Sequence, residues 1–181
     1  MTKIKKENMR ALLGGGDRRS LGRAAEAIVL VRRSPNRLGE LFACLWEGDP
    51  RVRMRAADAL EKISREKGGL LQRYKAELLG LLAEEGQQEV RWHLALMTPR
   101  LRLTAAECER VADNLQRYLE DRSSIVKTLA MQGLADLTQQ SPGLRPRVTE
   151  LIRELTRTGT AAMRARGRKL LKRLEAEAVT D

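Results

Sequence analysis

Imidazole and thiol side chains, which often serve in acid–base and nucleophilic catalysis, are scarce in this chain. It has one histidine, His93, and two cysteines, Cys44 and Cys108. A nucleophile, a base and an orienting group would have to include His93, because it is the only imidazole. Two thiols and one imidazole are also too few for a histidine-rich or Cys/His metal site. We therefore expect a protein that is not an enzyme, with no catalytic residue, no metal and no cofactor.

Trp92 and His93 are the adjacent residues that give the most specific indication of a binding site. In one interpretation Trp92 is a binding anchor, or a platform on which a nucleic-acid base stacks, with Arg55 nearby. In the other, Trp92 packs against Leu96 and Met54, and His93 is solvated or hydrogen-bonded. The sequence leaves both interpretations open.

Positive charge gathers near the two ends of the chain. The net charge is +11, and residues 1–37 hold ten Lys/Arg against three acids, while residues 143–173 hold ten against two. Arg164, Arg168 and Lys172 recur every four residues, so on a helix they share one face. Such a face either binds an anion or gives the last unit of a repeat array its polar outer surface.

The candidate binding residues are expected to lie on copies of one helical pattern, seen most clearly at residues 49–63. Asp49 is suited to the N-cap and Pro50 to the first helical position. Apolar residues then recur at spacings of four, four and three, which indicates one buried stripe: Val52, Ala56, Leu60 and Ile63.

The same pattern returns four more times at offsets of 32 to 38 residues, in 17–31, 89–101, 125–137 and 162–174. A second apolar pattern precedes each copy, and no stretch alternates with period two, so we expect helix pairs and no strands. Ser34 and Ser141 are expected N-caps, and Thr104 with Glu107 an expected capping box. The predicted helix pairs span about 4–33, 34–67, 69–101, 104–140 and 142–178, within a single domain over 1–181.

The phrase Asp-Pro-Arg-Val-Arg at 49–53, followed by Ala56-Ala57 and Ala59-Leu60, resembles the second helix of a HEAT repeat. The resemblance implies an all-α, right-handed α-α superhelix, or solenoid, of about five HEAT-like helical hairpins. It also implies that the second helices line a concave surface. The candidate binding residues there are Met54, Arg55, Asp58, Trp92, His93 and Leu96.

The resemblance also implies a polar ladder between repeats, built from an acid six residues before a basic residue. Three copies keep this spacing: Glu47–Arg53, Glu85–Arg91 and Asp121–Lys127. In the first and last copies Gly15 and Thr158 stand in place of the acid. The alternative is three exposed ion pairs, each worth only ~0–1 kcal/mol.

Such an array is expected to be a non-enzymatic protein–protein interaction module or scaffold that uses its concave surface and basic ends. The alternative is a HEAT-like protein that binds duplex DNA, distantly similar to alkylation-repair glycosylases. The several tryptophans of that group are absent, and Trp92 with Asp58 or Asp136 would be the candidates here.

The remaining expectations concern environment. Cys44 and Cys108 lie on first helices two units apart, on the order of 20 Å for stacked helices, so two reduced and mostly buried thiols are expected. Trp46, at the end of a first helix, is expected to cover the core. No run of 18 apolar residues and no secretory h-region are visible, so we expect a cytoplasmic monomer without a membrane partner.

Overall fold

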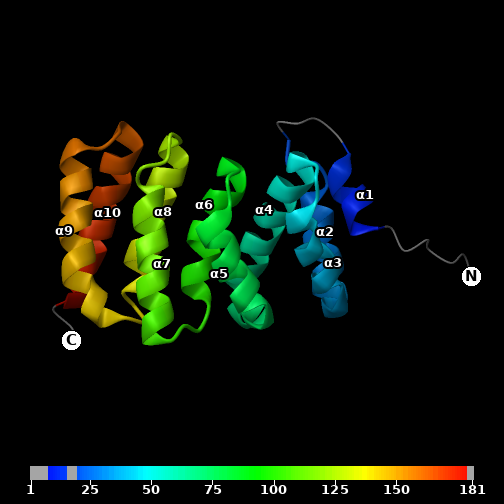
Figure 1. Cartoon of the computed structure of the whole chain (residues 1–181), viewed down its shortest axis with the longest axis horizontal. Helices are drawn as coiled ribbons and strands as arrows, with labels where there is room; N and C mark the ends of the chain where they lie inside the picture. Colours follow the sequence, from blue (N-terminus) through cyan, green and yellow to red (C-terminus); the bar gives the residue numbers. More distant parts are fainter. Residues whose placement is uncertain (1–7, 16–19, 179–181) are drawn as a thin grey trace, which may run out of the picture. The chain divides into compact units, whose positions relative to one another are not determined.

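The computed structural model describes residues 8–15 and 20–178 of the chain. Within these ranges every regular element is a helix and there is no strand (Figure 1). The prediction of an all-α fold is therefore confirmed. Residues 4–7, at the start of the first predicted helix pair, and Asp17 in its second helix lie outside the described residues.

The chain forms two compact units, Met1–Lys67 and Gly68–Asp181. The division falls between the second and third helix pairs expected from the sequence. Each unit has its own set of packed helices and is described separately below.

The described part of unit 1 contains four α-helices: α1 (Met9–Gly14), α2 (Ala24–Arg33), α3 (Leu38–Ala43) and α4 (Pro50–Glu66). Two single 3₁₀ turns, η1 (Pro35–Arg37) and η2 (Cys44–Trp46), flank α3. Helix α4 is the centre of this unit, because it packs against α1, α2, α3 and η2.

Helix α4 begins and packs as its sequence predicts. The Asp49 carboxylate accepts a hydrogen bond from the Arg51 backbone N–H at 2.9 Å, and Pro50 occupies the first position. The predicted apolar stripe is buried along its whole length, and the flanking Ala57 and Ala59 are fully buried as well. Small side chains beside the stripe let the backbones of neighbouring helices approach closely.

Unit 2 contains six α-helices and three 3₁₀ segments. The α-helices are α5 (Lys75–Glu84), α6 (Gln88–Met97), α7 (Ala105–Tyr118), α8 (Ser124–Leu137), α9 (Arg145–Thr158) and α10 (Ala161–Ala178). The 3₁₀ segments are η3 (Gly68–Tyr74), η4 (Thr98–Arg100) and η5 (Pro142–Leu144).

The second helix of each pair in unit 2 packs on the second helix of the next pair. Helix α8 contacts α6 on one side and α10 on the other, while α7 packs on α8 and α9 on α10 (Figure 1). The repeated apolar position of these three helices, Val90, Val126 and Met163, is buried in each. The equivalent positions of these predicted copies therefore all face the core between helices.

One glycine fixes how closely α6 and α8 approach. A Cβ atom on Gly133 of α8 would lie 2.3 Å from the backbone oxygen of Ala95 on α6. No other residue type fits without separating the two helices, so the absence of a side chain at position 133 sets their spacing.

The predicted caps were partly right. The capping box at the start of α7 is complete: Thr104 accepts from the Glu107 backbone N–H, and the Glu107 carboxylate accepts from that of Thr104. Ser34 and Ser141 do occupy N-cap positions, each followed by a proline in the first turn, but neither side chain makes a cap hydrogen bond. A 3₁₀ turn that starts at a proline follows each serine, and the α-helix begins only after it.

Candidate functional site

Helices α6, α8 and α10 lie side by side in unit 2, and we call the half-buried side of these three helices the second-helix face. It is lined by Trp92, His93 and Leu96 from α6, Gln132 and Asp136 from α8, and Arg166 and Arg173 from α10. All seven side chains are half-buried. They occupy the sides of their helices away from the buried stripes, so each remains within reach of solvent.

A charged network joins α8 to α10 on this face. Arg166 donates to the Gln132 side-chain oxygen at 2.9 Å, and Arg173 pairs with the Asp136 carboxylate at 2.7 Å. Gln132 in turn donates to Asp136 at 2.7 Å. The network holds four side chains in place across α8 and α10, so the polar groups of this face are ordered.

The aromatic part of the face lies on α6. The rings of Trp92 and His93 meet edge to face, with centroids 5.8 Å apart. Leu96 follows one turn after Trp92 on the same side of the helix. This group combines a large apolar side chain, a polar ring and a smaller apolar neighbour, which is the composition of a protein-binding anchor.

The sequence predicted three of these residues and missed four. Trp92, His93 and Leu96 were expected as a binding surface, whereas Gln132, Arg166 and Arg173 were not among the candidate binding residues and Asp136 was a candidate only for the DNA alternative. A signal was available, since Asp136 and Arg173 occupy the same place in their copies, 37 residues apart. Opposite charges in one repeat position on adjacent helices predict a cross-helix pair.

The other three predicted concave residues, Met54, Arg55 and Asp58, belong to α4 in unit 1. The expectation for Arg55 is corrected: its side chain is 0% exposed and its guanidinium binds three backbone carbonyls, those of Leu13, Gly15 and Ser20. Asp58 is also buried and accepts from Lys62 at 2.8 Å. Only Met54 is half-exposed.

One contact across a helix pair has the form expected of the polar ladder. Arg91 of α6 pairs with Asp121, which precedes α8, at 2.6 Å, and also donates to the Glu85 backbone oxygen. Its guanidinium lies over the Tyr118 ring, 5.3 Å from the centroid. Arg91 thus connects one predicted repeat to the acid of the next.

The other ladder residues make different contacts. Arg53 donates to the Leu45 backbone oxygen at 3.0 Å, and Glu47 pairs with Arg10 at 2.9 Å. Lys127 has no ion-pair partner among the described residues. The next copy carries Thr158 where the acid would be, which explains why Lys127 lacks one.

The predicted basic face of α10 is exposed. Arg164, Arg168 and Lys172 all face solvent, and none has an ion-pair partner in the described part of the chain. Their flank of the helix differs from that of Arg166 and Arg173, which contact α8.

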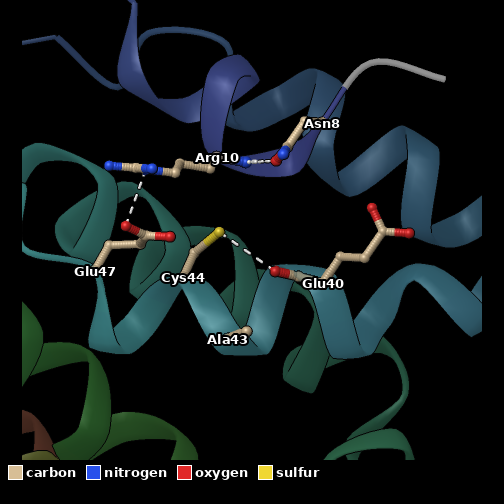
Figure 2. Close-up of a pocket in the computed structure, with 6 residues that line it drawn as sticks. All are labelled: Asn8, Arg10, Glu40, Ala43, Cys44 and Glu47. Atoms are coloured by element: carbon tan, nitrogen blue, oxygen red, sulfur yellow. Dashed lines mark hydrogen bonds and ion pairs between the residues drawn. The ribbon is translucent and has the colours of Figure 1, made fainter. Parts of the chain in front are cut away.

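Unit 1 contains a shallow hollow of about 550 Å³ beside α1 and α3, lined by Asn8, Arg10, Glu40, Ala43, Cys44 and Glu47. Figure 2 shows the ion pair between Arg10 and Glu47 and the Cys44 thiol directed at the Glu40 backbone oxygen, 3.3 Å away. Burial and the nearby Glu47 carboxylate raise the pKa of Cys44 to about 11. The thiol therefore stays protonated at neutral pH and is a weak nucleophile.

Both cysteines are free and buried, as the sequence predicts. Burial raises the pKa of Cys108 as well. In the described residues no group of three or more His, Cys, Asp or Glu side chains is arranged to hold a metal ion. Trp46 covers the core only partly, since it packs on Phe42 with centroids 5.2 Å apart but remains 53% exposed.

No family model matches the chain, and no curated protein matches it either. Among the helices of the described ranges, none combines the length and the apolar composition needed to cross a bilayer.

Proposed function

We propose that this chain is a HEAT-like solenoid of about five helical hairpins that acts as a non-enzymatic protein–protein interaction module. The second-helix face, with Trp92, His93 and Leu96 at its aromatic end, holds the protein partner. The observation that carries this proposal is the side-by-side packing of α6, α8 and α10.

The repeat architecture is supported by two relations between equivalent positions. The repeat stripe is buried at Val90, Val126 and Met163. Arg91 and Asp121 form the cross-repeat contact that the HEAT resemblance implies. Helices whose equivalent residues face the core, with one such contact between neighbouring pairs, pack as stacked repeats do.

The choice of a protein partner rests on the chemistry of the face. Trp92 is large and half-exposed, and ordered polar groups on α8 and α10 surround the same surface. Protein interfaces have this composition, an aromatic anchor beside a polar rim of satisfied hydrogen bonds.

The test is affinity capture with the full chain as bait, in wild-type form and as two tryptophan variants. Trp92→Ala removes the proposed anchor, and Trp46→Ala is the matched control because it removes an exposed tryptophan from unit 1. We expect a defined set of proteins to be captured by the wild type and by Trp46→Ala and lost with Trp92→Ala. Equal melting temperatures of the variants would show that folding is preserved.

Two results would end the proposal. One is the same set of captured proteins with Trp92→Ala as with the wild type. The other is loss of every captured protein with Trp46→Ala and retention with Trp92→Ala, which would move the binding surface to unit 1.

A further inference from the structure

The last helix carries a row of free positive charge. Arg164, Arg168 and Lys172, which we call the α10 ridge, are exposed and follow each other at intervals of four residues. At 1.5 Å per residue the ridge is about 12 Å long. Like charges at this spacing repel each other, so the ridge lowers the stability of the free protein unless an anion binds there.

The ridge differs from the other arginines of the same region. On α10 itself, Arg166 and Arg173 are engaged by Gln132 and Asp136. On α9, Arg153 pairs with Glu150, and its other nitrogen faces Glu175 at 3.8 Å. Asp136 thus neutralises Arg173, and Glu150 and Glu175 face Arg153, whereas the three ridge cations have no ion-pair partner among the described residues.

The surroundings of the ridge favour a polyanion over a protein. The exposed large apolar side chains among the described residues are Leu21, Val29, Trp46 and Ile125, and none lies on α10. A protein interface needs an apolar or aromatic centre, which the ridge lacks. One strand of a DNA duplex carries a phosphate every 3.4 Å of axis, so about 12 Å faces three to four phosphates.

We propose that the α10 ridge binds the phosphate backbone of duplex DNA, with each of its three cations against one phosphate and without readout of base sequence. This site is separate from the second-helix face and does not depend on the protein-binding function proposed there. Arginine supplies two of the three cations, and its forked guanidinium suits a phosphate oxygen pair.

The experiment is fluorescence anisotropy of a labelled mixed-sequence duplex DNA titrated with the full chain at several salt concentrations. The test variant is Arg164→Ala/Arg168→Ala/Lys172→Ala. The control is Arg102→Ala/Arg110→Ala/Arg122→Ala, which removes three exposed cations from scattered places in unit 2. Both variants lose the same net charge. The comparison therefore distinguishes binding at the ridge from nonspecific attraction of DNA to a positively charged protein.

We expect the ridge to account for a slope of about −2.7 in a plot of log affinity against log salt, as three phosphate contacts imply. This contribution alone weakens binding roughly 40-fold between 50 and 200 mM salt. The ridge variant should lose that part of the slope, and the control variant should keep it.

Three results would overturn the proposal. The first is the absence of duplex binding by the wild type at 50 mM salt. The second is the same affinity and the same salt slope for the ridge variant and the scattered control. The third is equal competition by polyglutamate at matched charge concentration, which would assign the ridge to acidic proteins.

Discussion

Arg55 Nη1 donates a hydrogen bond to the backbone oxygen of Leu13 at 2.6 Å, across 42 residues of sequence. Leu13 lies in the last turn of α1, where backbone carbonyls have no partner within the helix. The same guanidinium binds the carbonyls of Gly15 and Ser20. A single buried side chain of α4 therefore caps α1 and ties both ends of the segment that leads towards α2.

Arg55→Ala should lower the free energy of unfolding by about 3 kcal/mol or more, because it removes the donor to three backbone carbonyls, one of them in a buried contact, and leaves a cavity. Denaturant unfolding followed by circular dichroism measures the loss. Arg51→Ala is the control, since it removes an exposed guanidinium from the same helix. A loss no greater than that of the control would show that the carbonyl contacts contribute little.

Gly22→Ala should destabilise unit 1 for two reasons. Gly22 has φ +51°, where a side chain is strained by roughly 1–2 kcal/mol, and an added Cβ would lie 2.9 Å from the Arg55 guanidinium carbon. In an Arg55→Ala background the second cost disappears. A double-mutant cycle should therefore show coupling between positions 22 and 55, and strictly additive losses would contradict the proposed contact.

Gly133→Ala and Gly80→Ala should have opposite effects. The first places a methyl group 2.3 Å from the Ala95 backbone oxygen and should cost about 1–3 kcal/mol by forcing α6 and α8 apart. The second lies within α5 with no atom in reach of the new methyl group, and should stabilise by roughly 0.5–1 kcal/mol. Melting temperatures that move in the same direction would disprove the close approach.

The pair Arg91 and Asp121 should show a coupling of about 1 kcal/mol in a double-mutant cycle with alanine, because Asp121 is largely buried. The control cycle uses Asp121 and Lys127, the two residues that share the six-residue spacing in one copy. We expect little coupling in the control. A larger coupling for Lys127 than for Arg91 would reverse the assignment of the contact.

Cys44 should make stability depend on pH in the alkaline range. Burial raises its folded-state pKa to about 11, above the usual value near 8.5 for an unfolded thiol. The contribution is complete below the unfolded pKa and is lost as the pH rises towards the folded one, because only the unfolded thiol then ionises readily. Between about pH 8 and pH 10, the free energy of unfolding should fall more steeply with pH for the wild type than for Cys44→Ala. Equal slopes would show that the thiol is not protected.

The sequence alone determined the helices and most of their buried faces. In α4 the cap at Asp49, the proline after it and the stripe from Val52 to Ile63 are local features, and each depends only on residues within a few turns. Helical periodicity and capping are decided at that distance, so they can be read without the fold. The thiols at Cys44 and Cys108 were predictable for the same reason, as apolar positions of first helices.

Only the tertiary structure decided which polar residues of those helices are available for binding. Arg55 of α4 and Trp92 of α6 fall at adjacent positions when the predicted copies are aligned, yet Arg55 is fully buried and Trp92 half-exposed. The difference comes from backbone carbonyls at the end of α1 and before α2. These carbonyls accept hydrogen bonds from Arg55, although they lie 35 to 42 residues away from it in the sequence. A helical pattern fixes the direction of a side chain on its own helix, whereas burial depends on which distant backbone packs against it.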